Sequence, residues 1–83
     1  MSEVGRQEKP RLYRMGKLAE RAGVSRQIVN TYCMYGLLKE AERTEGGHRL
    51  FDESSVRRIR LIRQLKARYS LAEINRIFIR DKK

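Results

Sequence analysis

The sequence is poor in the residues that build disulfides, metal centres and membrane spans. Its 83 residues include one Cys, one His, one Pro and no Trp. The single cysteine, Cys33, cannot form an internal disulfide, which fits a reducing compartment. One Cys and one His are too few ligands for a closed zinc site, so no metal is expected. No apolar run could span a bilayer and no secretory signal opens the chain, so the sequence predicts a cytoplasmic protein.

Patterns typical of catalysis are equally scarce. Cys33 falls in a predicted helix and His48 in a predicted turn, so the two are a poor pair for thiol catalysis. The chain has no glycine-rich phosphate loop, and it offers few aromatic side chains for stacking on RNA bases. The sequence therefore predicts a protein that is not an enzyme and that uses no cofactor.

Positive charge is what the chain has in excess. It carries 20 Lys and Arg against 10 Asp and Glu, a formal net charge of +10. Most of the excess falls within residues 11–36 and 53–70, which are largely predicted helices. Basic helices give a shaped positive surface, which suits a polyanion: nucleic acid first and an anionic membrane second.

Residues 15–35 have the pattern of a helix–turn–helix. The first helix is predicted over residues 15–22 and the second over about residues 26–35. Gly23 can adopt the positive φ that ends the first helix, and Ser25 is a suitable N-cap for the second. The residues predicted to pack inward from this segment are Leu18, Ala19, Ala22, Val24, Ile28, Val29, Tyr32 and Gly36.

The other side of the second helix is largely polar with long side chains. It carries Arg26, Gln27, Asn30, Thr31 and Met34. A helix lying in a DNA major groove requires such a face, although a solvated helical corner is the alternative. Gln27 and Asn30 can pair bidentately with adenine, and Arg26 can bind guanine or a phosphate. The Thr31 methyl can contact a thymine methyl.

The pattern of residues 43–49 predicts the tip of a β-hairpin, and a flexible loop is the alternative. Gly46 and Gly47 permit positive φ at both central turn positions. The apolar residues around the hairpin are expected to start a strand or to anchor the chain in the core: Leu37, Leu38, Leu50 and Phe51.

Two further helices are predicted after the hairpin. Asp52 is a good N-cap for a helix over residues 53 to about 69, and Ser70 with Glu73 forms a capping box that opens a fourth helix. The residues expected to pack inward are Val56, Ile59, Ile62, Leu65, Tyr69, Leu71, Ile74, Ile77 and Phe78, with Leu61 beside them. The predicted fold class is therefore mostly α: a four-helix winged helix–turn–helix with a small β-hairpin wing between the second and third helices.

Motifs over residues 13–78 together resemble the DNA-binding domain of the MerR family, the mercury-resistance-regulator type of bacterial transcription factor. They are Leu18-Ala-x-x-Ala-Gly-Val-Ser25, Tyr32-x-x-x-Gly-Leu-Leu38, Arg43-Thr-x-x-Gly-x-Arg-Leu-Phe51, Leu61-Ile-x-x-Leu65 and Ser70-Leu-x-Glu-Ile74. The resemblance implies that the second helix enters the major groove and that the wing reaches the flanking backbone. With the charge pattern it gives these expected DNA-binding residues: Arg26, Gln27, Asn30, Thr31, Tyr32, Arg43, His48, Arg49, Arg57 and Arg58.

The chain departs from the family pattern in several places. Asn30 and Thr31 stand where an arginine and an aromatic residue are common, Cys33 replaces a frequent acid, and His48 replaces the usual aromatic of the wing. No heptad pattern persists beyond Phe78, so the long coiled-coil dimerisation helix and effector region typical of the family are expected to be missing. The alternatives are a fragment of a longer regulator, an isolated domain and a minimal family member without a sensor. The expected domains are a flexible segment over residues 1–11, the DNA-binding domain over residues 12–79 and a basic tail over residues 80–83.

The predicted function is sequence-specific binding of double-stranded DNA by a MerR-like transcriptional regulator associated with the bacterial nucleoid. The alternatives are an excisionase-like or architectural DNA-bending factor, and a protein-interaction module whose basic helix binds an acidic partner. Expected partners are duplex DNA, RNA polymerase or a promoter complex indirectly, and a second copy, on DNA or through the missing C-terminal helix. No membrane is expected as a partner.

Overall fold

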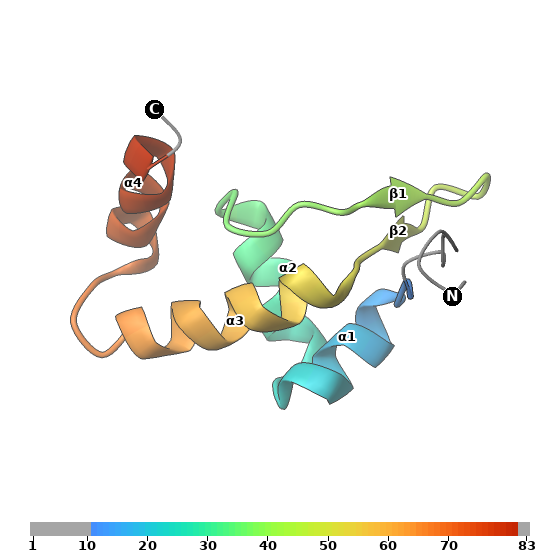
Figure 1. The fold of residues 1–83 in the computed structure, drawn as a ribbon, viewed down its shortest axis with the longest axis horizontal. Helices are drawn as coiled ribbons and strands as arrows, with labels where there is room; N and C mark the ends of the chain where they lie inside the picture. The colour runs from blue at the N-terminus through green and yellow to red at the C-terminus, as the bar shows by residue number, and fades with distance from the viewer. Residues whose placement is uncertain (1–10, 82–83) are drawn as a thin grey trace, which may run out of the picture.

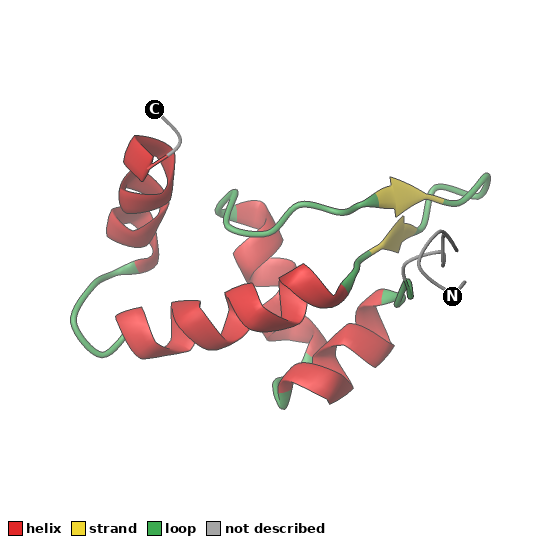
Figure 2. Cartoon of the chain, in the orientation of Figure 1, coloured by secondary structure: helices red, strands yellow, loops and turns green. Residues whose placement is uncertain are grey.

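The computed structural model describes residues 11–81 as four helices and one antiparallel hairpin (Figure 1; Figure 2). In chain order the elements are α1 (Met15–Ala22), α2 (Arg26–Met34), β1 (Glu42–Arg43), β2 (Arg49–Leu50), α3 (Glu53–Leu65) and α4 (Leu71–Asp81). The predicted order of four helices with a hairpin between the second and third is confirmed. The segment expected to be flexible lies outside the described residues except for Arg11, and the tail lies outside them at Lys82 and Lys83.

α1 and α2 form the predicted helix–turn–helix, and the two boundaries at the turn, the end of α1 and the start of α2, each have a visible local cause. Gly23 ends α1 with φ +76°, a left-handed conformation that glycine adopts without steric cost. The Ser25 hydroxyl oxygen accepts a 3.1 Å hydrogen bond from the Ile28 amide, which caps α2. α2 ends at Met34, so Tyr35 is its C-cap rather than its last helical residue.

The core lies where α3 crosses the helix–turn–helix pair, because α1 packs against both α2 and α3 (Figure 1). Its buried members come from every helix and from the segments that flank the hairpin. They are Tyr13, Leu18, Ala19, Ala22, Val29, Tyr32, Leu37, Leu38, Phe51, Val56, Ile59, Ile62, Ile74 and Phe78. Leu37 and Leu38 therefore anchor the chain as it leaves α2, as predicted. None of the helices within residues 11–81 has the length and apolar character needed to cross a bilayer.

The hairpin, residues 42–50, is called the wing below. Its strands pair Glu42 with Leu50 and Arg43 with Arg49. At its base the backbones of Tyr13 and Phe51 exchange two hydrogen bonds of 2.7 and 2.8 Å. The chain that enters α1 is thereby fastened to the chain that leaves the wing, so the wing and the start of α1 are neighbours.

The tip of the wing differs from its prediction in one respect. Gly47 has φ +88°, whereas Gly46 has no positive φ, so only one of the two glycines adopts the conformation expected of both. The reason is the turn that forms. The Gly47 amide donates to the Thr44 carbonyl and the Thr44 amide donates to the His48 carbonyl, which makes a longer loop than a two-residue turn with both central residues left-handed.

α3 is shorter than predicted. It begins after Asp52, whose carboxylate accepts a hydrogen bond from the Ser54 amide, but it ends at Leu65 rather than near residue 69. Beyond Leu65 the hydrogen-bond pattern changes, because the amides of Ala67 and Arg68 donate to carbonyls three residues earlier instead of four. Ser70 then caps α4: its hydroxyl accepts from the Glu73 amide at 3.1 Å, and the Glu73 carboxylate accepts from the Ser70 amide at 2.8 Å.

Tyr69, predicted to pack inward, and Leu61, predicted to lie beside the inward stripe, are both exposed. Tyr69 lies beyond the end of the helix and keeps 39% of its surface exposed, and Leu61 keeps 44%. α4 still packs through its predicted face, since Ile74 and Phe78 are buried and Leu71 and Ile77 pack partly buried against the core. α4 and the wing lie at opposite ends of the molecule (Figure 1).

Candidate nucleic-acid interface

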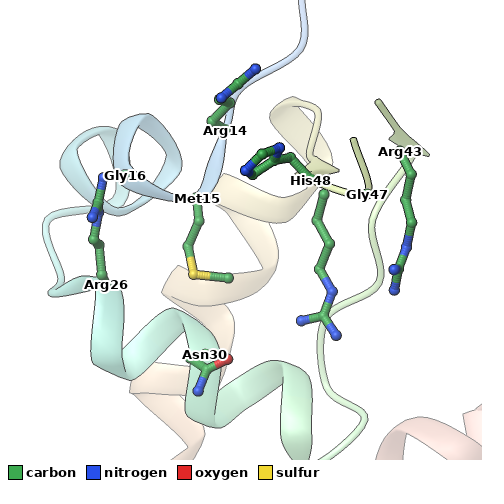
Figure 3. Close-up of a pocket in the computed structure, with 9 residues that line it drawn as sticks. Arg14, Met15, Gly16, Arg26, Asn30, Arg43, Gly47 and His48 are labelled. Carbon is green, nitrogen blue, oxygen red and sulfur yellow. The ribbon is translucent and has the colours of Figure 1, made fainter. Parts of the chain in front are cut away.

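A basic groove runs between the wing, the start of α1 and the first half of α2 (Figure 3). It encloses about 640 Å³. The residues that line it are Arg14, Met15, Gly16, Arg26, Asn30, Arg43, Gly47, His48 and Arg49. Four of these are arginines and none is acidic, so the groove is suited to a polyanion. The structure thus brings together Arg26, Asn30, Arg43, His48 and Arg49 from the set predicted by sequence.

The outward face of α2 continues from this groove onto the surface. Gln27 and Asn30 are exposed and Thr31 is half-buried. Met34 is 77% exposed, and its sulfur lies 3.8 Å from the Asn30 amide nitrogen. An exposed thioether beside two amides gives this face both hydrogen-bonding groups and an apolar contact, the two kinds of group that base edges recognise in the major groove.

The inward stripe of α2 is narrower than predicted. Val29 and Tyr32 are buried, but Ile28 is 38% exposed and Gly36 lies on the surface. The buried positions of α2 are Val29 and Tyr32, three apart, and Ile28 falls at the edge of the contact with α1. Gly36 instead forms the left-handed turn after α2, with φ +76°.

Tyr32 was expected both to pack inward and to contact DNA, and the structure supports only the first role. Its side chain is 3% exposed within the core. Burial raises the pKa of its hydroxyl above the ordinary value, and the nearby Arg63 opposes that shift. We therefore leave Tyr32 out of the candidate contact residues.

The wing arginines are held by a single carboxylate. Arg43 Nε lies 2.9 Å from one oxygen of Glu40, and Arg49 Nε lies 3.9 Å from the other. The hydrogen bond from Arg43 is the largest cause that holds the pKa of Glu40 below its ordinary value. Because Glu40 keeps its charge, it orients both guanidinium groups along one side of the basic groove.

Cys33 is half-buried and does not line the groove. Burial raises the pKa of its thiol, and the positive charge of Arg49 partly opposes the shift. A thiol with a raised pKa stays protonated at neutral pH and is a weak nucleophile. Among residues 11–81, no cluster of three or more His, Cys, Asp or Glu side chains could hold a metal ion.

The sequence that forms the helix–turn–helix, the wing and the basic groove matches a protein-family model. The model for MerR HTH family regulatory proteins covers residues 13–80. The chain belongs to this family. The fold and the resemblance inferred from its motifs are thereby confirmed.

Relatives of this MerR-family chain are bacterial regulators and a nodulation protein. The nodulation protein NolA of Bradyrhizobium elkanii is 45% identical over 67 residues, which are 80% of this chain and 31% of NolA. The mercuric resistance operon regulatory protein of Bacillus cereus is 33% identical over 66 residues, 78% of this chain and 50% of that protein. The chain thus spans about a third to a half of the length of these relatives.

Solved structures of MerR-family regulators share the same domain. One is HiNmlR, a MerR family regulator lacking the sensor domain, bound to promoter DNA. It aligns with a TM-score of 0.73 at 32% identity over 81% of this chain and 54% of its own. PbrR691 from Ralstonia metallidurans CH34, in complex with lead(II), aligns with a TM-score of 0.73 at 38% identity. That match covers 84% of this chain and 56% of PbrR691.

Two arginines expected to contact DNA lie outside the basic groove of this MerR-family domain. Arg58 is half-buried: its Nε donates a 3.1 Å hydrogen bond to the Leu37 carbonyl, and its guanidinium carbon lies 4.3 Å from the centre of the Phe78 ring. Arg57 is exposed on α3, beside Arg11 and the start of that helix. The structure therefore gives Arg58 a role in packing and does not bring Arg57 to the groove.

No sequence pattern indicated the groove residues that precede or begin α1 in this MerR-family domain. Arg14, Met15 and Gly16 line the groove only because the hydrogen-bonded pair of Tyr13 and Phe51 brings the start of α1 beside the wing. These two segments are far apart in the chain, and no periodic pattern connects them. Their proximity depends on tertiary structure alone.

Proposed function

We propose that this MerR-family domain, residues 12–79, binds double-stranded DNA in a sequence-specific manner, with α2 in the major groove and the wing on the flanking backbone. One observation carries the proposal: the outward face of α2 and the arginines of the wing border the same basic groove (Figure 3). Duplex recognition needs contacts to bases, which give sequence specificity, and contacts to phosphates, which fix the position of the protein on the DNA. A helix presented beside positive side chains can make both.

Different side chains serve these two needs. Gln27 and Asn30 are the candidates for reading base edges, and the exposed Met34 adds apolar contact for a thymine methyl. Arg43, His48 and Arg49 are the candidates for phosphate contacts. Thr31 is half-buried, and its methyl group is the candidate contact for a thymine methyl.

Promoter DNA is the class of target that we favour, because it is the ligand of the related HiNmlR structure. A module of this size buries about 600–1,000 Å² on DNA, so high affinity calls for two copies on one site. RNA polymerase would then be met indirectly, at the promoter. The activity is binding rather than catalysis, and its place is the nucleoid in the bacterial cytoplasm.

Selection from random duplexes tests the proposal. The chain is expected to enrich a defined site, which can be inspected for inverted repeats, and sedimentation with that duplex gives the stoichiometry. Affinity should fall steeply with salt, by about 0.9 log unit per log unit of salt for each phosphate contact. Failure to enrich any site would refute sequence-specific recognition. A shallow salt dependence would refute the phosphate contacts.

A further inference from the structure

Gly16, in the first turn of α1, lies directly against the guanidinium group of Arg26 at the start of α2. A Cβ atom built on Gly16 would lie 2.8 Å from Arg26 Nη2 and 2.9 Å from Arg26 Nε, closer than real Cβ contacts allow. The glycine backbone is helical and has no positive φ. The backbone therefore does not require glycine here, but the position of Arg26 does.

Glycine at this position opposes helix formation, since alanine is the better helix former. Because Gly16 has no Cβ atom, it leaves the α1 backbone uncovered at this point, and a long side chain can lie against it. Figure 3 shows the Arg26 side chain running towards Gly16 rather than along α2 towards Asn30. Among the side chains that the structure describes, those of residues 11–80, no Asp or Glu forms an ion pair with Arg26.

We propose that Gly16 is a positioning residue that holds Arg26 against α1, so that Arg26 contacts the DNA backbone and not a base. The inference rests on the proposed function. In a helix–turn–helix the first helix crosses the backbone, whereas the outward face of the second helix meets the bases. An arginine held on the first helix is therefore directed at phosphate, although its Cα belongs to the helix that reads sequence.

Four variants of the whole chain test this assignment: Gly16→Ala, Arg26→Ala, the double variant and the control Ala72→Gly. Ala72 is exposed and occupies the second position of α4, the position that the half-buried Gly16 occupies in α1, so it reports the helix preference alone. Each variant is titrated over a salt series with two duplexes, a selected site and an unrelated sequence of equal length. Thermal unfolding is measured in parallel.

Arg26→Ala is expected to bind both duplexes roughly tenfold more weakly. It should also lower the salt slope, which is the fall in log affinity per log unit of salt, by about 0.9. Gly16→Ala should lower the slope by a similar amount while its melting temperature stays equal or rises, because alanine favours the helix. The double variant should bind like Arg26→Ala alone, since displacing an absent side chain costs nothing. Ala72→Gly should melt lower and bind normally.

Two results would overturn the inference while leaving the proposed function intact. One is Gly16→Ala binding both duplexes with the affinity and salt slope of the unaltered chain. The other is Arg26→Ala changing base preference with no change in slope. If the unaltered chain binds neither duplex, the proposed function and this inference fail together.

Discussion

The side-chain amide of Asn75 in α4 donates a 2.8 Å hydrogen bond to the main-chain carbonyl of Tyr35, the C-cap of α2. Carbonyls at a helix end have no partner inside the helix, so this bond satisfies one of them. Gly36 leaves the space for it, because a Cβ there would lie 3.0 Å from the Asn75 amide nitrogen. α4 thereby closes the end of the helix proposed to read DNA.

Asn75→Ala is expected to lower the free energy of unfolding by about 1 kcal/mol, because the Tyr35 carbonyl loses its donor. Asn75→Asp keeps the shape and removes the donor, so it should destabilise at least as much at pH 7. Urea unfolding measures both. Arg80→Ala, exposed on the same helix, is the control and should change stability by less than about 0.5 kcal/mol. Equal stability of Asn75→Ala and the control would mean that the bond contributes nothing.

Arg58→Ala is expected to lower the free energy of unfolding by about 2 kcal/mol, since it removes both a hydrogen bond to Leu37 and the stacking on Phe78. Arg58→Lys retains the charge but loses the Nε donor and the planar group, so it should recover little of this loss. The exposed neighbour Arg60→Ala serves as the control in the same urea titrations. If Arg58→Ala keeps its stability but loses DNA affinity, Arg58 is a phosphate contact after all.

Arg49→Ala is expected to weaken binding to every duplex by roughly tenfold and to reduce the salt slope by about 0.9, because a phosphate contact carries no sequence information. Arg49→Lys should retain most of the slope, since it keeps the charge. Fluorescence anisotropy with selected and unrelated duplexes measures these changes. A loss confined to the selected duplex would show that Arg49 contributes to base recognition.

Gln27→Ala is expected to change base preference instead. A bidentate contact to a base is worth about 1–3 kcal/mol of discrimination, so its loss should relax specificity at one position of the site. Repeating the random-duplex selection with the variant measures this. If affinity falls equally for all sequences, Gln27 does not read a base.

Glu53 should make the stability depend on pH. The Tyr13 hydroxyl donates a 3.0 Å hydrogen bond to its carboxylate and Arg21 lies 3.1 Å away, and together they lower the pKa of Glu53 below its ordinary 4.5. A lowered pKa adds stability that is present above pH 4.5 and is lost as pH falls through the lower, folded-state value. Glu53→Gln should therefore be less stable than the unaltered chain at pH 7, and the difference should narrow at about pH 3.

Tyr13→Phe is the matched variant for this pH dependence, because it keeps the buried ring and removes the donor. Its stability should fall less between pH 7 and about pH 3 than that of the unaltered chain, as followed by urea unfolding at both pH values. The difference in unfolding free energy between Glu53→Gln and the unaltered chain is expected to change with pH. If this difference stays constant, the Glu53 carboxylate does not cause the pH dependence.

Local chemistry made most of the fold predictable from sequence. Gly23, Ser25, Asp52 and the Ser70–Glu73 capping box each act through neighbours a few residues away, so the starts of α2, α3 and α4 and the end of α1 were predicted correctly. The end of α3 was not, because its apolar spacing continues to Tyr69 without a Gly or Pro to mark a stop. Periodicity does not show that residues 66–69 form the turn between α3 and α4.

The candidate site was predictable in its types of residue but not in its arrangement. Periodicity separates the faces of α2, yet it cannot say how wide the buried stripe is, and Ile28 was therefore misassigned. The placement of Arg26 over Gly16 depends on how closely α1 and α2 pack. The involvement of Arg58 in the core depends on α4, which follows it in the chain.

The two adjacent glycines at the tip of the wing, Gly46 and Gly47, should differ in their tolerance to mutation. A Cβ atom at position 46 would meet nothing closer than 3.6 Å, whereas position 47 needs the left-handed backbone that only Gly and, at some cost, Asn adopt readily. In a saturation library screened for folded protein, position 46 should diversify freely and position 47 should stay nearly invariant. Gly46 can therefore be replaced by other residues, whereas Gly47 cannot.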